Sequence, residues 1–178
     1  MIPTVTVIDN FLSVPECKHL IQVFYQLVIQ TATKPQDEPW RQLEDSIYMR
    51  YPPGDNEFNS WPSSDHFISK MNKKLSKAMN NEYVVEWCNL ARWDVGTHQP
   101  LHLDGTSPRT CMTTVFYLNE EFEGGRTYFD DGTSIAPKTG RVLVFNGEKS
   151  VHGVANITKG TRYSLSAWWM KNYDGLDD

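Results

Sequence analysis

The sequence is poor in cysteine and in long apolar runs, and each of these absences excludes a class of protein. Its three cysteines, Cys17, Cys88 and Cys111, are widely spaced among 178 residues and form no C-x-x-C pair. Neither a disulfide framework nor a zinc knuckle is therefore expected. No apolar run approaches the roughly 20 residues that a membrane-spanning helix needs, so no membrane association is expected.

Blocks of basic residues are also missing. The formal net charge is −5, and the longest run of Lys or Arg is the pair Lys73-Lys74. Proteins that bind nucleic acid usually carry a basic face, so nucleic acid is not expected as a partner. The opening residues Met1-Ile2-Pro3-Thr4 do not begin a charged and then apolar leader. Together with the cysteine pattern, this predicts a reduced, cytoplasmic protein.

Aromatic residues, in contrast, are abundant. The chain has six Trp, eight Tyr and eight Phe, and 39% of its residues are hydrophobic, which argues against disorder. A chain of this length can bury one sizeable core. We therefore predict a single domain over residues 1–178, in which residues 1–81 form a helical support region and residues 82–171 a strand-rich core.

Two helices are predicted in the N-terminal region. Ser13-Val14-Pro15-Glu16 is a capping-box pattern with a proline in the first turn, and the helix is expected to run to about Gln30. Ser63-Ser64-Asp65 caps a second helix. The apolar residues of this second helix recur at helical spacing: Phe67, Ile68, Met71, Leu75 and Met79. The segments Thr31–Pro39 and Glu57–Pro62 are rich in turn residues and are candidate substrate-covering lids or plain surface loops.

Short runs of β type, separated by Gly, Pro and Asn, dominate the rest of the chain. Two strands are expected before residue 82, over Thr4–Ile8 and Ser46–Tyr51. The later strands are expected at Tyr83–Trp93, Met112–Leu118, Arg126–Phe129, Ser134–Ala136, Arg141–Phe145, Val151–Ala155 and Arg162–Met170. Many short strands with turn signals suggest a sandwich or jelly roll. The predicted fold class is α+β, with the N-terminal helices packed on one sheet.

Two histidines and a carboxylate carry the strongest chemical signal. His102-Leu103-Asp104 places two ligating side chains at i and i+2, which point to the same side of an extended strand. His152 follows 50 residues after His102, and Arg162 stands ten residues past His152. Two imidazoles and one carboxylate with open positions form the facial triad of non-haem Fe(II) oxygenases. We therefore predict that His102, Asp104 and His152 are metal ligands and the catalytic centre.

These residues lie within a longer series of motifs. Trp93 and Gly96 precede the H-x-D pair. The motifs that follow it are Phe116-Tyr117-Leu118-Asn119, Gly124-Gly125-Arg126-Thr127-Tyr128-Phe129, Pro137-Lys138-Thr139-Gly140, Val142-Leu143-Val144-Phe145 and Gly160-Thr161-Arg162-Tyr163-Ser164. From about Asn89 to Trp169 the chain resembles the 2-oxoglutarate- and Fe(II)-dependent dioxygenases, in particular their prolyl 4-hydroxylase-like branch.

The resemblance implies a double-stranded β-helix and an enzyme. It implies Fe(II), 2-oxoglutarate as co-substrate and O2, with ascorbate as an accessory, and hydroxylation of an unactivated C–H bond with release of succinate and CO2. A prolyl residue of a peptide or protein is the expected substrate. Hydroxylation of a free amino acid or other small molecule stays open as an alternative, as does a metal-binding jelly roll without turnover.

Further site residues follow from the same resemblance. Arg162 is expected to bind the far carboxylate of 2-oxoglutarate, because a guanidinium offers a planar fork to a carboxylate. Tyr117 and Ser164 are expected to add hydroxyl groups to the same carboxylate. Trp93, His98 and Tyr128 are candidates for the substrate side.

The chain departs from the branch near the mouth of the predicted site. Relatives often carry Gln directly after the glycine and Tyr two residues later, where this chain has Thr97 and Gln99. These positions bear on the identity of the substrate more than on the cofactor chemistry. The sequence does not determine the oligomeric state.

Overall fold

The computed structural model describes residues 5–30, 45–50, 64–105 and 107–171, so the two candidate lids and Met1–Thr4 lie outside the described residues. The helices are α1 (Val14–Gln30) and α2 (Ser64–Met79). The strands are β1 (Val5–Ile8), β2 (Asp45–Arg50), β3 (Tyr83–Trp93), β4 (Gln99–His102), β5 (Thr110–Tyr117), β6 (Glu123–Gly124), β7 (Thr127–Phe129), β8 (Ser134–Ile135), β9 (Val142–Phe145), β10 (His152–Val154), β11 (Ile157–Lys159) and β12 (Arg162–Lys171). Within the described residues, no helix is long and apolar enough to cross a membrane.

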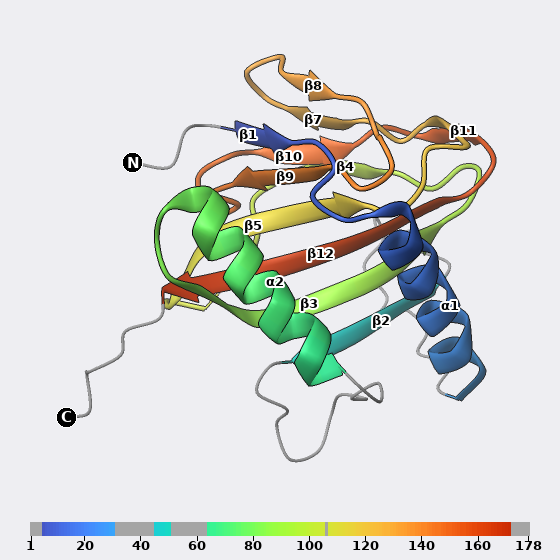
Figure 1. The fold of residues 1–178 in the computed structure, drawn as a ribbon. Helices are drawn as coiled ribbons and strands as arrows, with labels where there is room; N and C mark the ends of the chain where they lie inside the picture. The colour runs from blue at the N-terminus through green and yellow to red at the C-terminus, as the bar shows by residue number, and fades with distance from the viewer. Residues whose placement is uncertain (1–4, 31–44, 51–63, 106, 172–178) are drawn as a thin grey trace.

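A six-stranded antiparallel sheet forms the central layer of the molecule, with the order β1-β9-β5-β12-β3-β2 (Figure 1). The long strand β12 lies between β5 and β3, and its register pairs Arg162 with Trp93 and Trp168 with Trp87. Because side chains alternate along a strand, β12 sends Trp169 to one face of the sheet and Trp168 to the other.

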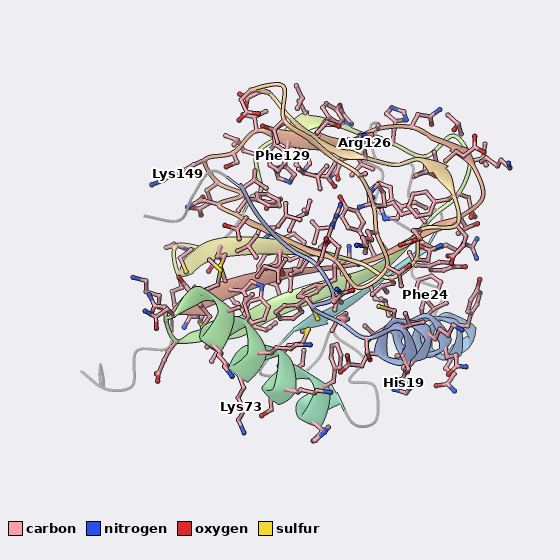
Figure 2. All side chains as sticks on the ribbon, turned by 45° about the horizontal axis from the view of Figure 1, so that its top comes forward. His19, Phe24, Lys73, Arg126, Phe129 and Lys149 are labelled. Atoms are coloured by element: carbon pink, nitrogen blue, oxygen red, sulfur yellow. The ribbon has the colours of Figure 1, made fainter. Side chains whose placement is uncertain are left out.

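Both helices pack on the same face of this sheet. Leu20 and Phe24 of α1 and Leu75 of α2 are fully buried in one hydrophobic core that includes Trp169. Figure 2 shows Phe24 on the inner side of α1, whereas Lys73 lies on the outer side of α2. The apolar spacing predicted for the second helix thus corresponds to the face that it buries.

The predicted capping box is present at the start of α1. The backbone N–H of Ser13 donates to Glu16 Oε2 at 2.7 Å, and the backbone N–H of Glu16 donates to Ser13 Oγ at 3.4 Å. Lys70 of α2 forms an ion pair with Glu16. One carboxylate therefore both caps α1 and joins the two helices.

The opposite face of the large sheet is covered by a four-stranded sheet with the order β4-β10-β7-β8. Phe129 of β7 packs between the two sheets against Leu143 and Phe145 of β9 and Tyr117 of β5. A third, two-stranded sheet pairs β11 with β6. The two stacked sheets enclose the space in which the predicted ligands meet.

The α+β prediction is confirmed, and the described strands that were predicted match to within two residues at each end. Three short strands were not predicted: β4, β6 and β11. Each has only two to four residues, too few for a periodic pattern to be visible, and each exists only because a distant strand pairs with it.

Candidate functional site

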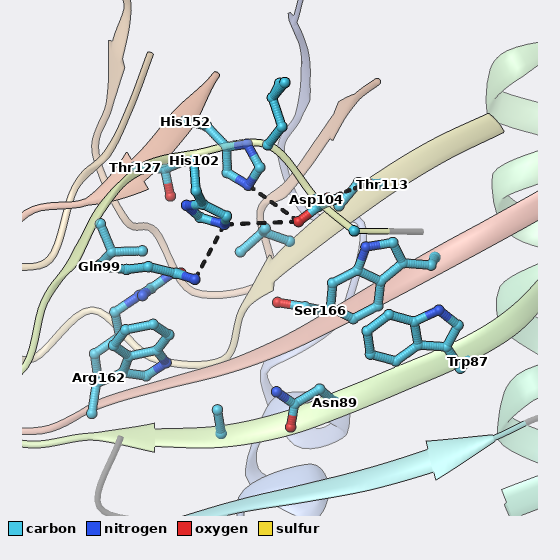
Figure 3. A pocket seen from close by; sticks show the side chains of 17 residues that line it. Trp87, Asn89, Gln99, His102, Asp104, Thr113, Thr127, His152, Arg162 and Ser166 are labelled. Carbon is cyan, nitrogen blue, oxygen red and sulfur yellow. Dashed lines mark hydrogen bonds and ion pairs between the residues drawn. The ribbon is translucent and has the colours of Figure 1, made fainter. Parts of the chain in front are cut away.

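His102, Asp104 and His152 converge between the two sheets (Figure 3). His102 ends β4 and His152 begins β10, and the two residues are register partners in the small sheet. Asp104 Oδ1 lies 3.8 Å from His102 Nε2 and 3.7 Å from His152 Nε2. One ligand atom from each residue lies within 4.8 Å of the others, so a single metal ion could contact all three.

The backbone fixes the orientation of both imidazole rings. His102 Nδ1 donates to Pro100 O and His152 Nδ1 donates to Ser150 O, each at 2.9 Å. With the proton held on Nδ1, the lone pair of each ring is on Nε2, the atom that faces Asp104. Such outer hydrogen bonds set the tautomer of ligating histidines.

Asp104 is held by two further contacts. Thr113 Oγ1 donates to Asp104 Oδ2 at 2.7 Å, which leaves Oδ1 toward the imidazoles. The backbone N–H of Asp104 donates to Gly147 O at 2.9 Å. A Cβ atom at Gly147 would lie 1.8 Å from Asp104 Oδ2 and 2.4 Å from Thr113 Oγ1. The absence of a side chain at Gly147 therefore makes room for the carboxylate.

His152 has an apolar environment. It is buried and packs edge-on against Phe145, with ring centroids 4.6 Å apart. Burial lowers the pKa of His152 and outweighs the opposing effect of Asp104. The ring therefore stays neutral at neutral pH, which is the form that binds a metal.

Arg162 lies at the start of β12 and is fully buried. Its guanidinium carbon is 4.9 Å from the ring centroid of Trp93 and 5.4 Å from that of Tyr117. Within the described residues, Nε and Nη1 have no hydrogen-bond partner. Burial lowers the pKa of Arg162 to about 10, so the group still carries its charge at neutral pH. A buried cation with unused donors suits an anionic ligand, because two rings stabilise its charge but accept no conventional hydrogen bond.

The predicted hydroxyl residues lie close to Arg162. Tyr117 is fully buried, and its hydroxyl donates to Thr127 Oγ1 at 2.6 Å. Ser164 Oγ accepts a hydrogen bond from Trp93 Nε1 at 3.0 Å. Arg162, Trp93 and Thr127 line the cavity beside the triad, whereas Tyr117 and Ser164 are not among its lining residues.

A cavity of about 290 Å³ joins the triad to Arg162. Its lining on the large sheet follows the alternation of β3 and β12: Trp87, Asn89, Ala91, Trp93, Arg162, Ser166 and Trp168. Sequence reasoning singled out only Trp93 and Arg162 as site residues among these. Counting back in steps of two from Trp93, and forward in steps of two from Arg162, would have found the others, because alternate residues share a face.

His98 and Tyr128 are not among the residues that line this cavity. His98 is exposed beside the turn at Gly96, and Tyr128 donates its hydroxyl to Gln99 O at 3.4 Å. Gln99, which sequence reasoning treated only as a departure from the family pattern, lies closer to the predicted metal ligands. Its side-chain amide lies 3.1 Å from His102 Nε2, so Gln99 contacts the ligand atom itself.

The residues present fit an Fe(II) site with a dicarboxylate co-ligand. Two imidazoles and a carboxylate on one side leave coordination positions open toward the cavity. Structural zinc sites instead close four ligands around the ion. The unpartnered donors of Arg162 lie along the same cavity and match the distal carboxylate of 2-oxoglutarate.

Comparisons with known proteins agree with this geometry. Residues 88–170 match the family model of the 2OG-Fe(II) oxygenase superfamily. Human prolyl 3-hydroxylase 2 is 36% identical over 64 residues, which cover 32% of this chain but only 9% of that protein. The match therefore spans about a tenth of the curated relative.

The fold is shared over nearly the whole chain. A viral collagen prolyl hydroxylase from Paramecium bursaria Chlorella virus-1 superposes with a TM-score of 0.70 at 21% identity, covering 94% of this chain and 96% of that one. A prolyl-4-hydroxylase from Pseudomonas putida gives 0.71 at 18% identity, with 95% and 93% covered. The predicted double-stranded β-helix is thus confirmed.

Proposed function

We propose that this chain, whose residues 88–170 belong to the 2OG-Fe(II) oxygenase superfamily, hydroxylates a prolyl residue of a peptide or protein. The reaction consumes 2-oxoglutarate and O2, inserts one oxygen atom into an unactivated C–H bond, and releases succinate and CO2. Residues 82–171 carry the catalytic site, and residues 1–81 form the helical support region, of which the structure describes α1, α2 and the edge strands β1 and β2.

One observation carries the proposal: the His102, Asp104 and His152 donor set and the buried, unpartnered Arg162 line the same cavity. A metal site alone has no need of a buried guanidinium in the same space. The pairing therefore favours an oxygenase over a metal-binding module without turnover.

The roles of the residues follow from their positions. His102, Asp104 and His152 hold Fe(II), and Arg162 binds the distal carboxylate of 2-oxoglutarate, with the Tyr117 and Ser164 hydroxyls next to it. When bound, the metal and 2-oxoglutarate supply the O2 chemistry that breaks the C–H bond. The protein contributes fixed ligand geometry, a counter-charge and a cavity that limits the access of water.

The prolyl substrate is supported by the relatives. Both the human sequence relative and the two solved structures are named as prolyl hydroxylases. They are distant or partial matches, so a peptide assay tests the substrate directly.

The test uses the purified chain with Fe(II), 2-oxoglutarate and a library of proline-containing peptides. We expect succinate formation and peptides that gain the mass of one oxygen atom at proline, and neither product with Asp104→Ala. Succinate formation with no oxidised peptide would overturn the prolyl substrate. Absence of both in the wild-type protein, despite stoichiometric Fe(II) binding, would support the metal-binding module.

A further inference from the structure

Two buried polar atoms on one wall of the cavity are not used by the proposed Fe(II) and 2-oxoglutarate sites. Asn89 Oδ1 and Trp168 Nε1 are each shielded from solvent and have no hydrogen-bond partner within the described residues. Buried polar groups are nearly always paired, and an orphan calls for an explanation such as a missing ligand. One of the orphans is an acceptor and the other a donor.

Both atoms belong to a wall that we define as Trp87, Asn89, Ser166 and Trp168. On the sheet, Asn89 is the register partner of Ser166, and Trp87 is that of Trp168. The indoles of Trp87 and Trp168 are stacked, with centroids 3.5 Å apart and an interplanar angle of 2°. The wall therefore presents its polar atoms on one face of the paired strands β3 and β12.

The wall lies beside the triad and away from Arg162. Thr113, which holds Asp104, is the register partner of Trp168. Arg162 and Trp168 are six residues apart on β12, which corresponds to roughly 20 Å of strand. In Figure 3, Arg162 and Trp87 lie on opposite sides of Asp104. A 2-oxoglutarate molecule bound between Arg162 and the metal would therefore leave this wall to the substrate that is oxidised.

The wall carries no charged side chain. Within the described residues, the charged groups that line the cavity are Asp104 and Arg162, and these are the groups proposed to bind the metal and 2-oxoglutarate. The polar atoms of these four side chains are uncharged, so they offer no counter-charge to the ammonium and carboxylate of a free amino acid, and burying an unpaired charge is costly. An uncharged group that both donates and accepts hydrogen bonds fits this wall.

We propose that Asn89 and Trp168 recognise backbone amides of the substrate, so that the enzyme selects a residue within a peptide and rejects the free amino acid. Asn89 Oδ1 accepts a peptide N–H, and Trp168 Nε1 donates to a peptide carbonyl. The inference rests on the proposed function, because it assigns the substrate side of the same site. Asn89 is then a specificity-determining residue of the reaction.

In the first experiment, the wild-type enzyme is incubated with saturating Fe(II) and 2-oxoglutarate and with one of two substrate mixtures. One contains the free amino acids, and the other contains peptides with acetylated N-termini and amidated C-termini. We expect the mass of one oxygen atom to be added to blocked peptides and not to free amino acids. Oxidation of free amino acids, or of neither mixture, would overturn the proposal, whereas succinate release without substrate still reports on the proposed function.

The second experiment combines a variant with a modified substrate. For the best blocked peptide, each backbone N–H that flanks the oxidised residue is replaced in turn by an ester oxygen. We expect one of these esters to lower kcat/KM of the wild-type enzyme by about tenfold relative to the all-amide peptide. Asn89→Leu should lower kcat/KM for the all-amide peptide by a similar factor. The same ester should not lower kcat/KM of Asn89→Leu any further, because the ester and the substitution remove the same hydrogen bond.

Val115→Ala is the matched control, because Val115 lines the same cavity without a polar side chain. It should leave the amide-to-ester ratio at about the wild-type value. Equal turnover of amide and esters by the wild-type enzyme, or an undiminished ester effect in Asn89→Leu, would overturn the assignment of Asn89.

Discussion

Gly147 and Asp104 lie so close that no side chain can be placed between them. The Gly147 carbonyl accepts the backbone N–H of Asp104 at 2.9 Å, and a Cβ atom on Gly147 would lie 1.8 Å from Asp104 Oδ2. The loop after β9 thus supports the proposed iron ligand from behind, although Gly147 follows Asp104 by 43 residues in the chain.

Gly147→Ala should therefore displace the Asp104 carboxylate and weaken Fe(II) binding at least tenfold while the protein stays folded. Anaerobic Fe(II) titration and circular dichroism measure the two properties. Gly105→Ala is the matched control, because a Cβ at Gly105 meets no atom within 4 Å. Equal Fe(II) affinity in both variants would contradict a supporting role for Gly147.

Replacing His102, Asp104 or His152 by Ala should each abolish stoichiometric Fe(II) binding and turnover, with little change in thermal stability. The reason is that an open three-ligand site contributes to catalysis more than to the core. Retention of Fe(II) affinity in all three variants would refute the ligand set.

Fe(II) affinity in the wild-type protein should fall in acid, because the ligands must be deprotonated. Burial lowers the pKa of His152, so the neutral, metal-binding form of this ring persists to lower pH than in a free histidine. Fe(II) titrations between about pH 5 and pH 8, the range in which histidine normally titrates, measure how the affinity depends on pH. An affinity that rises on acidification would contradict the assignment.

Arg162→Lys should leave Fe(II) binding intact but weaken the binding of 2-oxoglutarate. An ammonium keeps the charge but loses the planar fork. Loss of one charge-assisted hydrogen bond, about 1.5–3 kcal/mol net, corresponds to roughly ten- to hundredfold weaker binding. Arg162→Ala should have a larger effect, because it leaves a buried carboxylate without a cation. Unchanged 2-oxoglutarate affinity in Arg162→Ala would contradict the assignment of Arg162 as the anchor.

Tyr117→Phe tests whether the buried hydroxyl near Arg162 serves the co-substrate. The change removes the hydrogen bond to Thr127 and should lower the free energy of unfolding by about 1 kcal/mol. If the hydroxyl also binds 2-oxoglutarate, the KM for 2-oxoglutarate rises several-fold at constant Fe(II) affinity. Tyr128→Phe, whose hydroxyl donates to Gln99 O, is the control and should leave that KM unchanged.

Glu16 should make the stability of the helical layer depend on pH. Partial burial opposes its charged form, but hydrogen bonds from Lys70 and Ser13 outweigh burial and lower its pKa from 4.5 to about 2. A carboxyl group with a depressed folded-state pKa stabilises the fold above the unfolded value, and this stabilisation is lost as the pH falls through the folded value. The contribution is therefore complete above about pH 4.5 and disappears toward about pH 2.

Chemical denaturation at pH 7 and at pH 3 checks this dependence. Glu16→Gln should be less stable than the wild type at pH 7, and the difference should shrink at pH 3. Glu82→Gln, at an exposed position just before β3, should show no such difference. If the free energy of unfolding of Glu16→Gln were lower than that of the wild type by the same amount at both pH values, the ionic origin of the effect would be contradicted.

The sequence by itself determined the features that depend on local order. The capping box at Ser13 and Glu16, the helical spacing of Leu75 and its neighbours, and the alternation of the long strands follow from backbone periodicity, which is local. The H-x-D pair with a distal histidine and arginine predicted which side chains would meet, because two imidazoles and one carboxylate form a known type of metal site.

Only the tertiary structure decided the features that depend on contacts between distant segments. The space for Asp104 behind Gly147, the amide of Gln99 on His102, and the orphaned atoms of Asn89 and Trp168 all arise where separate strands approach one another. Close packing fixes such contacts to within fractions of an ångström, and no one-dimensional pattern records them. The proposed cofactor chemistry could thus be inferred from the sequence, whereas the inferred recognition of the substrate required the folded cavity.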